Sequence, residues 1–325
     1  MRDTARRVWD VLPEPVQSSK VAVRAKAMAN ARVGAGTQQV VRTLAELDER
    51  LEFLARAAAV SDDELRRGFS TFRMEIDLQM PDDPFSEEYH RKVFDLYEWL
   101  HGKPYAPSNE IMAFEVARYT DVPFPYATQS GRTVGNYLIG MGHVIRTLDL
   151  PPKSRLLEFG PGCGNTTLAL AQMGHQVTAI DIAPNIVDLI DERASRLNTS
   201  VETIVGDFST IDELDGTYDA VLFFECFHHC AEHLDLLAGL NRVVAPGGRV
   251  LFAGEPISRK LSVPWGLRMD GESLWAIRTN GWLELGFRRS YFLSALERYG
   301  WVAKRVNCVE TPTGEIFVAR RGREI

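Results

Sequence analysis

One stretch, Arg155–Asp181, limits what this chain can fold into more than any other. It begins with a short apolar run that ends at Phe159, continues with three alternate glycines and a helix-like segment, and closes with a second apolar run that ends at Asp181. This order predicts a strand, a glycine turn, a helix and a second strand followed by an acid. Such a unit places a nucleotide-like ligand over the N-terminus of the helix, where the acid can bind ribose hydroxyl groups.

The spacing of the glycines distinguishes between two kinds of ligand. A dinucleotide-binding fingerprint would have its third glycine at the position of Asn165, so the pattern disfavours a nicotinamide dehydrogenase. The pattern here is acid-x-G-x-G-x-G, from Glu158 to Gly164. With Asp181 at the end of the next strand, it resembles the first motif of the class I S-adenosylmethionine-dependent methyltransferases. The resemblance implies a Rossmann-like fold, S-adenosylmethionine as cofactor and a transferase reaction.

The chain after Asp181 continues to alternate between strand-like and helix-like segments, as a doubly wound parallel sheet requires. It ends in a predicted hairpin, which is typical of the methyltransferase family. We therefore expect an α/β fold with a seven-stranded, mostly parallel sheet in residues 151–325, interrupted by a lid-like insert at 257–287. The predicted strands are Leu156–Phe159, Val177–Ile180, Val201–Val205, Tyr218–Phe224, Arg249–Ala253, Trp301–Cys308 and Glu315–Ala319.

The front half of the chain predicts helices rather than strands. Residues 1–36 show no long periodic pattern, and we expect a flexible N-terminus there. Residues 37–150 predict a helical region that caps the substrate. Within it, apolar residues at a heptad-like spacing over 40–58 favour either a coiled-coil contact in a homodimer or a helix packed on its own chain.

The resemblance also implies which residues bind the cofactor. The glycine loop would approach its methionine portion, Asp181 would accept from both ribose hydroxyls, and Asp207 would accept from the adenine amino group. One carboxylate suits a vicinal diol because its two oxygens can each accept a hydrogen bond. The full predicted set is Glu158, Gly160, Gly162, Gly164, Asp181, Ile182, Asp207, Phe208 and Glu225.

The candidates for catalysis follow the fourth predicted strand. An oxygen acceptor needs a base to remove its proton, and histidine titrates near neutrality. His229 and His228 are therefore the predicted catalytic residues, with Glu255 and Asp270 as weaker alternatives. His229 and His233 stand four residues apart and could share a metal with an acid, but the expected cluster of neighbouring acids is absent, and we expect no metal.

Composition limits the partners. The formal net charge of −7 disfavours nucleic acid as the main partner, because neutralising phosphates needs a basic surface. Four scattered cysteines and the lack of a signal peptide or membrane span predict a cytoplasmic protein. The aromatic and charged insert favours a saccharide or another small hydroxylated acceptor, and thus O-methylation, as in polysaccharide biosynthesis. N- or C-methylation of another metabolite, or a non-catalytic cofactor-binding scaffold, stays open.

Overall fold

The computed structural model describes residues 38–125, 128–307 and 315–322, so the predicted flexible N-terminus lies outside the described residues. The chain divides into two compact units. The smaller one holds the described residues up to Ile76 together with Asp270–Glu272, and the larger one holds the rest.

The smaller unit pairs two short parallel strands, β1 (Gln39–Val41) and β2 (Phe72–Met74), around a helical hairpin of α4 (Leu44–Ala58) and α5 (Asp62–Phe69). Thr43 and Glu46 form a reciprocal capping box at the start of α4. Leu54 of α4 packs so closely on Gly68 of α5 that a Cβ there would stand 2.4 Å from its Cδ2 atom. The heptad-like seam is thus used in part to pack this helix on its own chain.

The larger unit is built on a seven-stranded sheet, which confirms the predicted fold class. The order is β11-β12-β7-β6-β3-β4-β5, and only β12 runs antiparallel to its neighbours. The strands are β3 (Arg155–Phe159), β4 (Gln176–Asp181), β5 (Glu202–Val205), β6 (Tyr218–Phe224), β7 (Val244–Ala253), β11 (Trp301–Asn307) and β12 (Glu315–Arg321).

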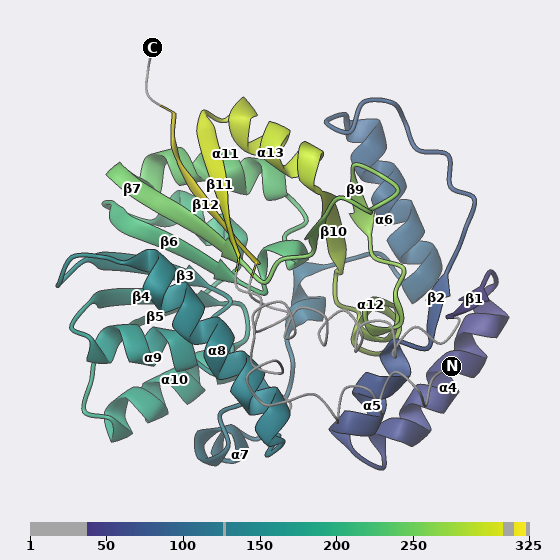
Figure 1. Ribbon diagram of the computed structural model, residues 1–325, viewed down its shortest axis with the longest axis horizontal. Helices are drawn as coiled ribbons and strands as arrows, with labels where there is room; N and C mark the ends of the chain where they lie inside the picture. The colour runs from purple at the N-terminus through teal and green to yellow at the C-terminus, as the bar shows by residue number, and fades with distance from the viewer. Residues whose placement is uncertain (1–37, 126–127, 308–314, 323–325) are drawn as a thin grey trace, which may run out of the picture. The chain divides into compact units, whose positions relative to one another are not determined.

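Helices cover both faces of this sheet (Figure 1). One face carries α8 (Gly131–Leu148), α9 (Asn165–Gln172) and α10 (Pro184–Arg196), and the other carries α11 (His233–Val243) and α13 (Arg289–Arg298). The central strand β6 is apolar and buried through its middle, as expected of a strand covered on both sides. The chain reverses its winding between β3 and β6, and a doubly wound sheet binds its ligand at such a point.

The remaining segments of the larger unit either precede the seven-stranded sheet in the sequence or connect its strands. Helix α6 (Glu87–His101) buries one apolar face, including Tyr89 and Tyr97. The insert forms a second, small sheet in the order β8-β10-β9, from β8 (Ile257–Ser258), β9 (Trp265–Leu267) and β10 (Leu285–Arg288). The other short helices are η1 (Pro107–Glu110), α7 (Val116–Asp121), η3 (Phe208–Glu213), η4 (Phe227–His229), η5 (Ala276–Asn280) and α12 (Gly271–Trp275), whose first two residues belong to the smaller unit.

Among the described residues, none of the helices combines the length and the apolar character needed to cross a membrane.

Candidate active site

A cavity of about 450 Å³ opens where β3, β4, β5 and β6 end, which is within the usual size range of small-molecule sites. Residues that directly follow these strands line it, so parallel pairing of the strands brings together segments that lie far apart in the sequence. The opposite wall comes from Tyr105, from Glu110 of η1 and from Trp282 of the insert.

Two glycines of the loop after β3 have no room for a side chain. A Cβ on Gly160 would stand 2.6 Å from Cβ of Cys226, and a Cβ on Gly164 would stand 2.7 Å from the Ile190 side chain. Both glycines have a positive φ, which other residues adopt only with strain. The Arg193 guanidinium donates to the carbonyl of Cys163 and to Asn165, so the loop is also held from outside. Its backbone can therefore approach a ligand closely.

Two acids follow the next strands. Asp181 ends β4, where burial raises the pKa of its carboxyl to about 6. Its Oδ1 atom accepts from the backbone N–H of Ala183 at 2.9 Å. Asp207 follows β5 and accepts from the backbone N–H of Ser209 at 2.8 Å. Both carboxylates line the cavity, and hydrogen bonds from a ligand to Asp181 would offset part of the cost of its burial.

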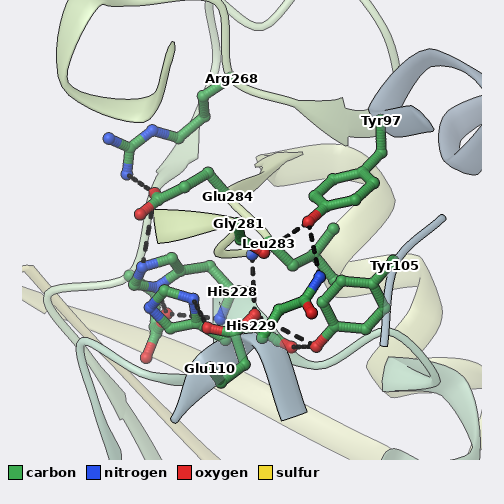
Figure 2. A network of polar contacts seen from close by, with 11 residues as sticks. Tyr97, Tyr105, Glu110, His228, His229, Arg268, Gly281, Leu283 and Glu284 are labelled. Carbon is green, nitrogen blue, oxygen red and sulfur yellow. Dashed lines mark hydrogen bonds and ion pairs between the residues drawn. The ribbon is translucent and has the colours of Figure 1, made fainter. Parts of the chain in front are cut away.

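A histidine–glutamate pair occupies the facing wall (Figure 2). The Nδ1 atom of His229 lies 3.3 Å from Oε2 of Glu110. The other oxygen of Glu110 accepts from the backbone N–H of Leu283 at 2.7 Å and from the hydroxyl of Tyr105 at 3.1 Å. Burial lowers the pKa of His229, but the charges of Glu110, Glu284 and Glu255 outweigh that effect and raise it to about 9.

A methyltransferase-domain family model matches residues 157–252, the segment that begins within β3, includes the glycine loop and ends within β7. The chain contains a class I S-adenosylmethionine-dependent methyltransferase domain.

Curated relatives match over part of the chain. A ubiquinone biosynthesis O-methyltransferase of Xanthomonas campestris is 33% identical over 105 residues, 31% of this chain and 43% of that one. An S-adenosyl-L-methionine-dependent Diels-Alderase of Talaromyces variabilis is 33% identical over 142 residues, 42% of this chain and 46% of that one. The chain thus spans less than half the length of these relatives.

Solved structures match over a larger share but at lower identity. A 1,6-didemethyltoxoflavin-N1-methyltransferase of Burkholderia thailandensis with bound S-adenosylhomocysteine is 21% identical, with a TM-score of 0.43, and the match covers 66% of this chain and 92% of that one.

The methyltransferase domain brings most of the predicted cofactor residues to one cavity. Ile182 and Phe208 line it with Ile186 and Ile211, forming an apolar slot next to Asp207 that suits a flat ring. Glu225 lines it at the end of β6. The cavity-lining members of the predicted set are Gly160, Gly162, Asp181, Ile182, Asp207, Phe208 and Glu225. The glycine cradle, the buried carboxylate and the apolar slot therefore fit S-adenosylmethionine.

Two predicted cofactor residues lie outside the cavity lining. Gly164 is the N-cap of α9 and packs on Ile190. Glu158 is buried within β3, where its carboxylate accepts from the Thr167 hydroxyl at 2.6 Å. Burial raises the pKa of Glu158 to about 7, despite the opposing effect of this hydrogen bond. Glu158 thus joins β3 to α9 beneath the glycine loop.

His228 lies behind His229 and does not line the cavity. Glu255, which follows β7, accepts at 2.8 Å from His228 Nδ1 and also accepts from the backbone N–H groups of Cys226, Phe227 and His228. Burial alone would raise the pKa of Glu255, but these hydrogen bonds together lower it. Glu255 therefore holds the segment that carries His229, rather than facing a ligand.

The other two sequence candidates lie elsewhere. Asp270, the second alternative base, forms a β-bridge with Arg73 in the smaller unit. His233, the candidate metal partner of His229, is buried with its Nε2 atom 2.8 Å from the Tyr291 hydroxyl. Burial lowers the pKa of His233 to about 3. The spacing of four residues does not bring His229 and His233 together, because η4 ends at His229 and α11 begins at His233.

A different trio has the right atom types for a metal. Donor atoms of His228, His229 and Glu284 all lie within 4.8 Å of one another. However, the Arg268 guanidinium lies 3.5 Å from Oε2 of Glu284, so a protein cation already stands beside this carboxylate (Figure 2). We therefore assign no metal to this trio.

The sequence reasoning missed the groups that surround His229. Glu110, Tyr105 and Glu284 carry no motif, and each comes from a segment far from the glycine loop in the sequence. Trp282, in the insert, lines the cavity, whereas Trp265, from the same insert, is buried and donates to the carbonyl of Pro84 at 2.8 Å. Only their tertiary neighbours distinguish these two tryptophans.

Proposed function

We propose that this protein transfers the methyl group of S-adenosylmethionine to a hydroxyl group of a small acceptor. The observation that carries the proposal is that His229, paired with Glu110, lines the same cavity as the glycine loop and Asp181. A proton-accepting group and a cofactor cradle in one cavity are the two components that O-methylation requires.

Holding the cofactor is assigned to the predicted residues that line the cavity. The backbone at Gly160 and Gly162 approaches the methionine portion, and Asp181 accepts from the ribose hydroxyls. Asp207, Phe208 and Ile182 bind adenine, and Glu225 lies on the side of the methionine ammonium. When bound, the cofactor supplies a methyl group that its sulfonium already activates.

His229 is assigned as the general base. It must be neutral to accept the proton of an acceptor hydroxyl, whereas its pKa of about 9 makes it an imidazolium in the free protein at neutral pH. His229 would lose its proton more readily with a cationic cofactor in the same cavity, because like charges disfavour the protonated form. Glu110 then stabilises the imidazolium that forms as the acceptor is methylated. His228 acts behind it, as a positioning residue held by Glu255.

A saccharide is the acceptor that the sequence favours, and polysaccharide biosynthesis is the corresponding process. Trp282 supports this choice because an aromatic wall can stack on a sugar ring, and Glu110 lies in the same wall. The O-methyltransferase names among the curated relatives support oxygen as the methylated atom. N- or C-methylation is the alternative. A cytoplasmic location stays a prediction from the sequence.

A homodimer through residues 40–58 is a second proposal from the sequence. The side chain of Phe53 on α4 is 40% exposed, and Leu44 and Leu51 of the seam are only partly buried, which leaves apolar surface for a second copy. Light scattering on the protein as it elutes from a size-exclusion column would give twice the chain mass for a dimer. A single chain mass at high concentration would reject it.

Calorimetry and a methyl-transfer assay together test the proposed function. S-Adenosylhomocysteine should bind, NADH should not, and labelled S-adenosylmethionine should label an acceptor in small-molecule or glycan extracts. His229→Ala should lower turnover by about 10²–10⁴-fold with cofactor affinity unchanged, while His101→Ala, outside the cavity, should change neither. Binding without turnover in any extract would favour the non-catalytic scaffold instead.

A further inference from the structure

Nearly all the charged side chains that line the cavity are acidic. Among the described residues that line it, none is a lysine or an arginine, and His229 is the one group that can carry a positive charge. The acids that line it are Glu110, Asp181, Asp207, Asp212, Glu225, Glu232 and Asp235.

Cations near this wall compensate only part of its charge. The Arg242–Asp212 pair, at 3.5 Å, is largely exposed and therefore screened by solvent. His90 lies 3.3 Å from Glu232, which raises the pKa of His90 and lowers that of Glu232, so this pair offsets the charge of Glu232. Glu110 is paired with His229. Even with His229 protonated and a singly charged cofactor bound, carboxylates outnumber cations around the cavity. A ligand in this space therefore meets a net negative potential.

We infer that the acceptor is uncharged or cationic and carries no carboxylate or phosphate group. This inference rests on the proposed function, since it concerns the second ligand of the same cavity. An anionic group would be brought out of water towards carboxylates with no guanidinium or ammonium in the lining to pair with it, which is unfavourable. A neutral hydroxylated molecule or an amine meets no such penalty, and a cation can also interact with the faces of Tyr105 and Trp282.

The inference narrows the saccharide proposal. Sugar phosphates, nucleotide-linked sugars and uronic acids are disfavoured as acceptors, whereas neutral sugars and amino sugars are favoured. Among aromatic acceptors, phenols and phenolic amines are favoured over phenolic acids.

Fractionation of acceptors by charge tests this directly. A small-molecule extract is separated on an anion exchanger at pH 7.5, and each fraction is incubated with the full chain and methyl-labelled S-adenosylmethionine. We expect the label in products from the unretained fraction, at least tenfold above the retained one, which corresponds to about 1.4 kcal/mol of discrimination. Label mainly in products from the retained fraction would overturn the inference but would still support the proposed methyl transfer. Absence of both cofactor binding and transfer would overturn the proposed function, and this inference with it.

Matched probes sharpen the test. Catechol, dopamine and 3,4-dihydroxybenzoate share one hydroxylated ring and differ in charge, as do methyl glucoside, methyl glucosaminide and methyl glucuronide. As inhibitors of the labelling reaction, the neutral and cationic members should act at least tenfold more strongly than the acid. Equal or stronger inhibition by the acid would contradict the inference.

Replacing an acid of the cavity lining by a lysine should weaken the preference for uncharged and cationic acceptors. Asp235→Lys places a cation on the lining and should raise the ratio of retained to unretained label several-fold. Glu213→Lys is the control, since Glu213 is an exposed acid that does not line the cavity. The same ratio in both variants and in the unmodified chain would show that the wall charge does not select the acceptor.

Discussion

The Nδ1 atom of His229 lies 3.3 Å from Oε2 of Glu110, and this pair joins the segment before the sheet to the carboxyl end of its central strand. Glu110 is itself oriented by Leu283 and Tyr105, so the carboxylate has a defined position next to the imidazole (Figure 2). The charge state of His229 thus depends on a residue from a different part of the chain.

Removal of the Glu110 charge should shift the pH dependence of methyl transfer to lower pH. The base must be deprotonated, so kcat/KM of the unmodified protein should rise with pH through about 9. Glu110→Gln removes the strongest charge effect that raises the pKa of His229. The charges of Glu284 and Glu255 remain and still raise it. His228 and Asp181 are the other titratable groups close to His229. The rising limb should therefore move towards the ordinary histidine value of about 6.5. Tyr105→Phe keeps the charge and should shift it less; an unmoved limb in Glu110→Gln would remove His229 from the base role.

Asp181→Asn should weaken cofactor binding and stabilise the fold. Loss of the charged acceptor should cost about 1–3 kcal/mol of binding free energy for S-adenosylhomocysteine, measured by calorimetry. Burial raises the pKa of Asp181 from 3.8 to about 6, so the ionised carboxylate lowers folding stability at any pH above 6. This penalty is on the order of 3 kcal/mol at neutral pH and vanishes below the unfolded pKa.

The melting temperature of Asp181→Asn should accordingly exceed that of the unmodified chain at pH 7.5, and the difference should shrink as the pH falls to 4. Asp188→Asn, an exposed acid on α10, is the control and should change neither quantity. Unchanged affinity in Asp181→Asn would place the ribose elsewhere.

Glu255→Ala should destabilise the protein by about 3–5 kcal/mol, because it leaves three buried N–H groups and the His228 imidazole without their acceptor. Urea unfolding measures this difference. Glu213→Ala removes an exposed acid outside the cavity lining and should change the free energy of unfolding by no more than about 0.5 kcal/mol. Equal stability of the two variants would show that Glu255 does not hold the segment.

Gly160→Ala should destabilise the domain by about 1–3 kcal/mol and abolish cofactor binding, because the new Cβ would collide with Cys226 at a positive φ. Gly142→Ala is the matched control: this glycine lies within α8, and a Cβ there meets nothing within 4 Å. It should stabilise the helix by up to about 1 kcal/mol with binding unchanged. Normal cofactor affinity in Gly160→Ala would contradict the assigned cradle.

Chelation of metal ions should leave methyl transfer unchanged within twofold. Arg268 already provides a cation next to Glu284, the carboxylate that a metal at His228 and His229 would need. Assays with and without excess EDTA measure this. Loss of activity that Mn²⁺ or Zn²⁺ restores would show that the trio binds a metal.

The strand, glycine loop, helix, strand and acid of the cofactor half could be predicted because they are local. Each predicted cofactor-binding acid lies at or just after the end of a strand, and a parallel sheet brings the carboxyl ends of neighbouring strands to the same edge. The order of apolar runs and turns therefore located Asp181, Asp207 and Glu225 at the cavity before any contact was known. Residue type also predicted a candidate base at that edge, and His229 does line the cavity.

Only the tertiary structure decided how the histidines divide their roles. His228, His229 and His233 are close in sequence and alike in chemistry, but the first meets Glu255, the second Glu110 and the third Tyr291. These partners come from distant segments that pack against the carboxyl end of β6. Burial and neighbouring charges, rather than residue type, raise the pKa of His229 and lower that of His233. A sequence pattern contains the spacing of residues along the chain but not the long-range contacts that create these environments.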